Sequence, residues 1–494
     1  SRYTPSSTLQ RMELLKTGYM GTLSLGWDNY LFLELTGRQE RSSTLKDQSF
    51  FYPSANLSFL FTQAFHMPSW WNYGKLRLSY GIVGNAPETY TANIVYEQGS
   101  DNGFTWNTIP SSWGNADIHP EKKYEYEIGL ESKFLNNRLG IDISYYNNRV
   151  KDQILSTPQP STSGVKNVLM NVGEVANHGW DISISATPIL TRDFRWDLTA
   201  NYGVYKNKVV KLADGVPYLE ILNSGGSGIK IQAVEGQPMG DIYAQVPQVN
   251  ENGEYLVSDK GLYLNQTELQ KVGNINPAGV GGLFNSFSYK NVFLDFSIDF
   301  RIGGDVINEM NQYATAVGLT PESLKYRDTE HGGLSYYYPG DNNSSGIPVQ
   351  VDPSTGAGPN GEIIYHDGII LPGVVASTGE RNTRIIPAGY YYNTTYNWGT
   401  EAEQLTYRHS VFDNSYVKLR ELTIGYQFPE KIISKLGLGR LSVSVFGRNL
   451  FYFYKALKNY DAESSVGTSW ANQATVGSST TATRSFGVSL RASF

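Results

Sequence analysis

The last eleven residues, 484–494, read RSFGVSLRASF and alternate strictly between two kinds of side chain. Phe486, Val488, Leu490, Ala492 and Phe494 are apolar, whereas the residues between them are small or polar. This period-2 alternation predicts a β-strand with one apolar face and one polar face. Because chain ends usually fray, a well-formed strand at this position is expected to pair with neighbouring strands.

The same alternation recurs along the whole chain. In residues 293–302, FLDFSIDFRI, large apolar residues from Leu294 onward alternate with Asp, Ser and Arg. Thirteen such segments are predicted as strands. They lie at about 18–28, 30–39, 50–62, 74–83, 124–134, 138–148, 178–187, 193–207, 283–290, 293–302, 416–428, 441–448 and 484–494.

The composition agrees with many half-apolar strands joined by polar loops. Aromatic residues make up 13% of the chain, charged residues only 17%, and there are 50 glycines. No apolar stretch approaches the roughly 20 residues that a membrane-spanning helix needs. The absence of cysteine excludes disulfides and thiolate metal sites. A net charge of -6 without a basic tract argues against nucleic acid as a partner.

The connections between the predicted strands alternate between short and long. The short ones are residue 29 and residues 63–73, 135–137, 188–192, 291–292 and 429–440, and the long ones are about 40–49, 84–123, 149–177, 208–282, 303–415 and 449–483. Bacterial outer-membrane barrels have short periplasmic turns and long extracellular loops. A soluble β-sandwich has no reason to place every long loop at one end. The pattern therefore favours an all-β protein, a transmembrane antiparallel β-barrel.

The direction of the strands indicates that this barrel is larger than the chain. If the last strand runs towards the periplasm, the first of thirteen strands does so too, which places residues 1–17 outside the cell. Bacterial single-chain barrels have even strand numbers and begin on the periplasmic side. We therefore expect residues 1–494 to form the C-terminal part of a barrel. Strand 484–494 would pair with 441–448 on one side and with a strand outside this chain on the other.

Several stretches resemble the SusC/RagA family of TonB-dependent outer-membrane transporters of Bacteroidetes. They occur in the family's order and span nearly the whole chain. The stretches are GKLRLSYGIVGN (74–85), HPEKKYEYEIGLE (119–131), GIDISYYNNRVKDQIL (140–155), NVGEVANHGWDISISATPI (171–189), EGQPMGDIYAQ (235–245), FNSFSYKNVFLDFSIDFRIGGDVIN (284–308), NSYVKLRELTIGYQFP (414–429) and LSVSVFGRNLFYF (441–453).

The resemblance implies a 22-stranded barrel, of which this chain would supply strands 10 to 22. The family's plug, TonB-contacting segment and N-terminal accessory domain would lie outside the chain. A SusD-like surface lipoprotein is implied as a lid over the extracellular loops, with TonB, ExbB and ExbD driving import of oligosaccharides or oligopeptides. The resemblance also implies that the terminal Phe494 is an assembly signal for the barrel-assembly machinery.

Catalytic and metal-binding patterns are weak. The six histidines are scattered without HExxH spacing, and no nucleophile motif accompanies them, so we expect no enzymatic activity and no cofactor. Residues 341–352 place oxygen-bearing side chains at calcium-loop positions, but Asp352 replaces the usual bidentate Glu and Pro348 intrudes. We therefore predict no metal site. The glycines of GVGG (279–282) are expected to form a turn before the ninth strand.

Aromatic clusters in the long loops are the candidate substrate-binding residues, because flat amphipathic rings can stack on sugars or grip peptide side chains. The alternative is that these rings pack against one another to order the loops. The candidates are Tyr336, Tyr337, Tyr338, Tyr390, Tyr391, Tyr392 and Trp398.

Charged residues of both signs are predicted on the lumen side of the strands, where a tightly filled barrel requires them to be paired. We expect most of them to bond the plug. They are Glu34, Arg38, Arg77, Glu125, Glu127, Arg195, Asp197, Asp295, Asp299 and Arg301.

The leading functional hypothesis is TonB-dependent import of oligomeric nutrients across the bacterial outer membrane. Two alternatives remain open: a passive porin-like or structural barrel, and a soluble secreted β-rich glycan-binding protein. A plug and a TonB-contacting segment would distinguish the first two, and solubility without detergent would favour the third.

Overall fold

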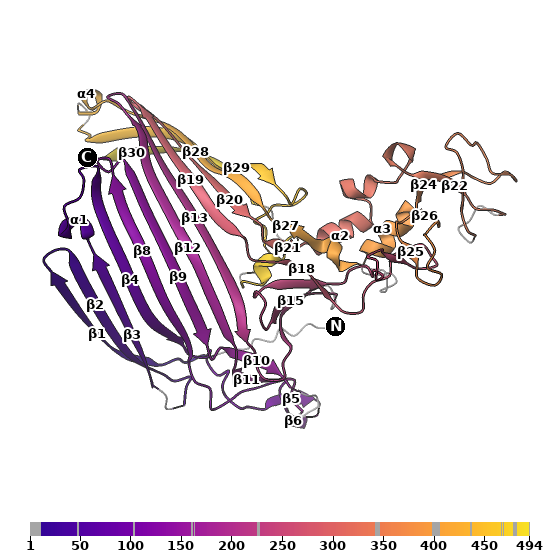
Figure 1. Ribbon diagram of the computed structural model, residues 1–494, viewed down its shortest axis with the longest axis horizontal. Helices are drawn as coiled ribbons and strands as arrows, with labels where there is room; N and C mark the ends of the chain where they lie inside the picture. The colour runs from indigo at the N-terminus through magenta and orange to yellow at the C-terminus, as the bar shows by residue number, and fades with distance from the viewer. Residues whose placement is uncertain are drawn as a thin grey trace.

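The computed structural model describes residues 11–46, 49–101, 104–159, 162, 164–224, 228–340, 346–397, 406–434, 437–465, 467, 469–477 and 482–493. Within this part of the chain, thirteen long strands form one antiparallel sheet (Figure 1). They are β1 (Lys16–Trp27), β2 (Leu31–Ser42), β3 (Ser49–Phe59), β4 (Trp71–Asn85), β8 (Glu121–Phe134), β9 (Leu139–Lys151), β12 (Glu174–Leu190), β13 (Phe194–Lys211), β19 (Gly279–Tyr289), β20 (Val292–Ile302), β28 (Tyr416–Gln427), β29 (Arg440–Lys455) and β30 (Ser485–Ser493).

Each inner strand of this sheet pairs with the previous and the next of the thirteen strands, so their spatial order follows the sequence. Each of the thirteen predicted segments contains one of these strands, and several strands extend beyond the predicted ends. For example, β29 continues seven residues past the predicted end at 448, to Lys455. The end of segment 50–62 was wrong, because β3 stops at Phe59 and residues 61–62 belong to a short helix. In the described residues, β1 pairs only with β2 and β30 only with β29. The sheet therefore has two open edges.

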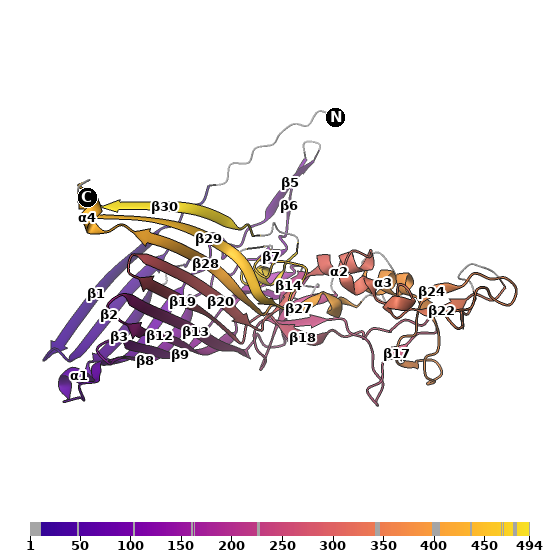
Figure 2. The same cartoon turned by 90° about the horizontal axis from the view of Figure 1, so that it is seen from above.

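The two ends of the sheet differ in the way the strands are joined. At one end the connections are tight, and residues such as Asp28, Asn29 and Lys290 adopt positive φ. Two short helices, α1 (Phe61–Ala64) and α4 (Glu430–Ile433), also lie at this end (Figures 1 and 2). The predicted alternation of short and long connections is therefore confirmed.

Aromatic rings cluster at the short-turn end. Trp70 stacks on Trp71 and on Phe134, with ring centroids 6.0 Å apart in both pairs. The side chain of Trp27, which ends β1, is 68% exposed. Large exposed rings at one level of a barrel are typical of a membrane interface.

At the opposite end the long connections fold into a body of small sheets and helices that extends away from the strands (Figures 1 and 2). Its cores are closed from water: Ile229, Ile231 and Ile242 are 0% exposed. The strands of these connections are β5 (Glu97–Asp101), β6 (Phe104–Thr108), β7 (Ser112–Trp113), β10 (Ile154–Pro158), β11 (Asn167–Asn171), β14 (Tyr218–Ser224), β15 (Ile229–Val234), β16 (Asp241–Ala244), β17 (Leu256–Val257), β18 (Gln270–Asn274), β21 (Asp305–Ile307), β22 (Leu334–Tyr337), β23 (Val349–Gln350), β24 (Tyr365–Ile369), β25 (Val374–Val375), β26 (Ile386–Pro387) and β27 (Val411–Asp413).

The helices of the body are short. They are α2 (Glu309–Ala316) and α3 (Ala388–Tyr396), with 3-10 turns η3 (Pro321–Leu324), η4 (Thr329–His331), η5 (Tyr407–Ser410) and η7 (Asn472–Ala474). The side chain of Asn308 caps α2 by accepting a hydrogen bond from the backbone N–H of Asn311, at 2.9 Å. No helix in the described ranges is long and apolar enough to cross a membrane.

One local prediction was wrong. The GVGG segment is not a turn, because Gly279 begins β19 and Gly281 pairs with Phe300 of β20. A Cβ atom at Gly281 would collide with the ring of Phe300, and one at Gly279 would collide with the ring of Tyr202. These glycines therefore make room for aromatic rings across neighbouring strands.

Candidate functional site

The strand register aligns the two faces of the sheet across many strands. One continuous apolar row runs Leu25, Leu33, Leu57, Leu78, Ile128, Tyr145, Trp180 and Val204. Another row runs Ile424, Val445 and Val488 on the last three strands. Several of these side chains are strongly exposed, including Val488 at 72%. The face that they form requires an apolar surrounding.

The opposite face is polar and concave. A cavity of about 680 Å³ is lined by side chains from strands as far apart as β4 and β28, so the sheet curves around it. Its wall includes Arg77, Asp142, Asp181 and Asp299. Arg77 bonds Asp142 through two nitrogens, with Nη2–Oδ1 at 2.6 Å and Nη1–Oδ2 at 3.2 Å. This bidentate pair spans three strands and fixes both side chains.

Many of the charges predicted on the lumen side are paired within this chain. Arg195 bonds its neighbour on the same face, Asp197, at 2.5 Å, and Ser286 donates to Asp295 at 2.6 Å. Asp299 receives a hydrogen bond of 2.5 Å from Arg420. These charges are therefore compensated in part without the plug, and their pairing with a plug stays a prediction.

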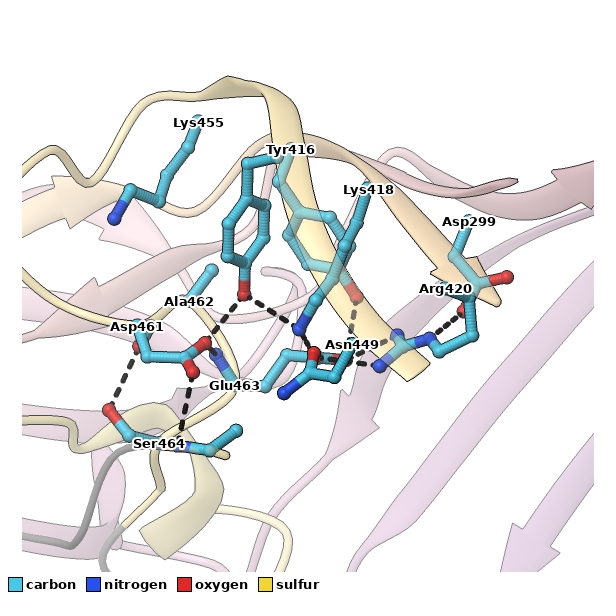
Figure 3. A network of polar contacts seen from close by, with 12 residues as sticks. Asp299, Tyr416, Lys418, Arg420, Asn449, Lys455, Asp461, Ala462, Glu463 and Ser464 are labelled. Atoms are coloured by element: carbon cyan, nitrogen blue, oxygen red, sulfur yellow. Dashed lines mark hydrogen bonds and ion pairs between the residues drawn. The ribbon is translucent and has the colours of Figure 1, made fainter. Parts of the chain in front are cut away.

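At the rim of the concave face, the connection 456–484 is tied to the strands by a charged network (Figure 3). Its centre is Glu463, which receives hydrogen bonds from Lys418 at 2.6 Å and from Arg420 at 2.6 and 2.9 Å. Lys418 is only 1% exposed, and its ammonium group lies 4.6 Å from the ring centroid of Tyr452. A buried cation of this kind needs a compensating anion, which Glu463 provides.

The surroundings of Glu463 favour its charged form. Burial alone would raise the pKa of this carboxyl group, but the hydrogen bonds from Arg420 and Lys418 outweigh burial and lower the pKa to about 2. Next to Glu463, the hydroxyl of Tyr452 donates to Asp461 at 2.5 Å, and the Asn414 side chain donates to the Ala462 carbonyl at 2.9 Å. The turn 461–464 is therefore held from several strands at once.

Comparison with known proteins explains why one face is apolar and the other encloses a polar cavity. Residues 3–242 match the family model described as TonB dependent receptor-like, β-barrel. The TonB-dependent receptor P3 of Formosa agariphila is 24% identical over 494 residues, covering 91% of this chain and 42% of that protein. The chain is similar to TonB-dependent receptors over most of its length. Its sheet is thus part of an outer-membrane β-barrel, with the apolar rows towards lipid.

Two further proteins are similar to the chain, one in sequence and one in fold. The TonB-dependent receptor SusC of Bacteroides thetaiotaomicron is 30% identical over 247 residues, covering 46% of this chain and 24% of that protein. Among solved structures, the RagAB peptide transporter gives a TM-score of 0.65 at 18% identity, covering 91% of this chain and 45% of that one. The chain spans less than half the length of the curated relatives it matches.

The predicted substrate-binding tyrosines lie in the body, in two separate groups. Tyr336 and Tyr338 are 1% and 5% exposed, and their rings meet edge to face at 5.5 Å. Tyr392 is 4% exposed and donates its hydroxyl to the Glu322 carbonyl at 2.7 Å. These three rings order the loops from within, and their role in substrate contact stays a prediction.

The remaining candidates are less buried or cannot be placed. Tyr337, Tyr390 and Tyr391 are half-buried at the margins of the body. Trp398 and Phe494 lie outside the described residues, as do positions 341–345 of the calcium-like pattern. Within that pattern, Asp352 is described, and its Oδ1 accepts hydrogen bonds from Ser354. In the described ranges, no group of three or more His, Asp or Glu side chains could hold a metal ion.

The residues of the Glu463 network were not predicted as site residues. Lys418 and Arg420 come from β28, and Asp299 comes from β20. Glu463 lies more than forty residues after Lys418 in the sequence. One signal was available: Lys418 and Arg420 stand on either side of Leu419 in a strand whose only other charged residue is Glu421. Two cations on neighbouring positions of a barrel strand indicate a nearby anion.

Proposed function

We propose that this chain forms the C-terminal part of a TonB-dependent transporter that imports oligomeric nutrients, either oligosaccharides or oligopeptides, across the outer membrane. The observation that carries the proposal is the asymmetry of the sheet. An apolar face meets lipid, a polar concave face encloses a cavity of about 680 Å³, and a large folded body stands at one end only. SusC and the RagAB peptide transporter share this family or fold.

The proposal includes the parts that complete the barrel. Among the described residues, the outer edges of β1 and β30 have no neighbouring strand, and in a membrane such backbone must be paired with other strands. We assign those strands, the plug and the TonB-contacting segment to another part of the transporter. The charges that line the concave face, among them Arg77 and Asp181, would contact the plug. The terminal Phe494 would serve as the assembly signal.

The body formed by the long connections would contact the substrate and a SusD-like surface lipoprotein. It carries exposed apolar side chains that suit such a role, including Phe104 at 77% and Tyr96 at 61%, in the region of the projecting hairpin β5–β6 (Figure 2). Tyr337, Tyr390 and Tyr391 remain candidates for substrate contact. TonB, ExbB and ExbD would act through the part of the transporter that carries the plug.

Energy-dependent uptake tests this proposal. Cells that carry the complete transporter are compared with a deletion strain for uptake of fluorescently labelled oligosaccharides and oligopeptides, with and without a proton-motive-force uncoupler. Uptake that requires both the gene and the energised membrane is expected. Uptake that persists with the uncoupler would favour the passive porin-like barrel. Recovery of the protein in the soluble fraction without detergent would contradict every barrel hypothesis.

A further inference from the structure

A second cavity, of about 400 Å³, lies at the rim of the concave face, where the strands meet the long connections. Its wall is assembled from three sources. The strands contribute Tyr205, Arg301 and Tyr416, the body contributes Asn276 and Asn414, and the connection 456–484 contributes Glu463 and Trp470. A concave site in which a few polar groups converge among aromatic rings is the usual form of a small-ligand site.

The polar groups of this rim cavity are held rigidly. The guanidinium group of Arg301 donates from Nε to the Gly303 carbonyl at 3.2 Å and from Nη2 to the Ile275 carbonyl at 3.0 Å. The hydroxyl of Tyr205 donates to Asn276 at 3.1 Å. Within the described part of the chain, the remaining nitrogen of Arg301, Nη1, has no hydrogen-bond partner. Arg301 therefore offers one fixed nitrogen, Nη1, whose N–H groups its own scaffold does not use.

The same cavity offers a matching acceptor. Asn414 is 4% exposed, and its Nδ2 donates to the Ala462 carbonyl at 2.9 Å, which fixes the amide plane. Its Oδ1 is buried and accepts no hydrogen bond from any described residue. A buried acceptor without a donor is costly, so its presence in a cavity wall points to a group that arrives from outside.

Aromatic surface completes the wall. The side chain of Trp470 is 38% exposed, and no described residue bonds its indole N–H. The edge of its ring faces Gly240, where a Cβ atom would lie 3.0 Å from the indole. The rings of Tyr205 and Tyr416 also line the cavity. The cavity thus presents flat apolar faces beside one fixed donor and one fixed acceptor.

We propose that this rim cavity is a subsite for one ring of an uncharged oligosaccharide. A sugar hydroxyl is both donor and acceptor, so neighbouring hydroxyls can accept from Arg301 Nη1 and donate to Asn414 Oδ1. The C–H faces of the ring would lie on Trp470. This inference rests on the proposed function and narrows its substrate class from oligomers in general to neutral glycans.

The charges around the cavity argue against other ligands. Both oxygens of Glu463 are already engaged by Lys418 and Arg420, and Asp305 and Asp413 lie close enough to offset the charge of Arg301. No surplus of positive charge therefore remains for a phosphate or a carboxylate. Strand addition, one recurrent mode of peptide recognition, needs an exposed strand edge, whereas this wall is built from side chains of separate segments.

The test uses the complete transporter purified in detergent from its native membrane. It is presented with immobilised neutral oligosaccharides (glucans, mannans, xylans and fructans), acidic polyuronide fragments and a peptide library, and the bound class is then titrated by calorimetry. Trp470→Ala and Trp470→Leu remove the aromatic face, and Leu preserves side-chain bulk if Ala disturbs assembly. The matched control is Trp27→Ala, because Trp27 is 68% exposed at the short-turn end of β1 and lies outside the cavity.

We expect a neutral oligosaccharide to bind, with Kd raised about tenfold or more in both Trp470 variants and unchanged in Trp27→Ala. Equal affinities in the Trp470 and Trp27 variants would overturn the subsite. So would binding restricted to acidic fragments or peptides, or no binding of any neutral glycan. Energy-dependent uptake in cells separates the two proposals. If uptake remains normal in the Trp470 variants, the subsite is wrong while the transporter function stands, whereas loss of energy dependence in the wild type would contradict the function itself.

Discussion

The sheet and the body of this protein use apolar side chains in opposite ways. In β30, Phe486, Val488 and Leu490 are 73%, 72% and 69% exposed, whereas in the body Ile229 and Ile231 are fully buried. The sheet is stabilised by continuous backbone pairing and by a lipid environment, while the body depends on small water-excluding cores. One part of the chain is therefore stabilised in lipid and the other in water. The boundary between the two parts lies at the rim of the concave face.

The largest effect is expected where the two regions are joined. Replacing Glu463 by Ala leaves Lys418 buried without its anion, which should destabilise the attachment of connection 456–484 by about 3–5 kcal/mol. The measurement is the rate of limited proteolysis within this connection in the native membrane protein. Glu330→Ala, which removes an exposed carboxylate of the body, is the control. Equal cleavage rates for the two variants would show that the network does not hold the connection.

A second prediction tests the lipid face of the sheet. Val445 is 59% exposed and sits between Ile424 and Val488 in an apolar row. Val445→Arg should destabilise the barrel by about 2–4 kcal/mol if the row lies near the bilayer midplane. Ser444→Arg, one residue away on the opposite face, should cost much less. Both are measured by urea unfolding in lipid vesicles, and similar losses would contradict the assignment of the two faces.

A third prediction concerns the cores of the body. Ile231→Val removes one methylene from a fully buried side chain and should cost about 0.5–1.5 kcal/mol. The same substitution of Ile424, which faces lipid and is 54% exposed, should have a smaller effect because no protein cavity forms. Hydrogen exchange of β15 and of β28, measured by mass spectrometry, would compare the two sites. A larger loss of stability for the substitution at Ile424 than for the one at Ile231 would contradict this prediction.

The smallest effect is a pH dependence confined to the body. Burial lowers the pKa of His409 to about 4, with a further contribution from Arg408, and its ring stacks on Tyr396 at 4.4 Å. Because the unfolded histidine titrates near 6.5, the unfolded state binds more protons below that pH. The stability of the body should therefore fall as the pH drops from about 6.5 to 4. His409→Phe should remove this dependence from hydrogen-exchange rates around η5, while an unchanged pH profile would exclude His409 as its source.

The sheet was predictable because each of its strands carries its own signal. In β20, apolar residues alternate with Asp and Ser, so the apolar face and the length of the strand can be predicted from its own sequence. The misjudged GVGG segment illustrates the limit of local reading, since its glycines make room for rings on other strands. The placement of all long connections at one end of the sheet was also predictable, because short and long connections alternate along the sequence.

The site was far less predictable, because its contacts join distant positions. Lys418 and Glu463 are 45 residues apart in the sequence. Arg301 and Trp470 line the same cavity only because three long connections fold together. The tyrosine clusters show the related difficulty that composition does not reveal burial. Tyr336 and Tyr337 are neighbours in the sequence, yet only Tyr336 is fully enclosed. An aromatic repeat in a long loop therefore identifies candidate binding residues, but it does not show whether their rings lie on a binding surface or in a core.

The placement of every long connection at one end of the sheet has a consequence for how such proteins diversify. Insertions or exchanges in residues 303–415 leave the strand register untouched, because β20 and β28 pair directly with each other. The opposite end has no comparable freedom, since its tight turns fix which strands become neighbours. Evolution can therefore remodel the body while the membrane-embedded scaffold stays the same.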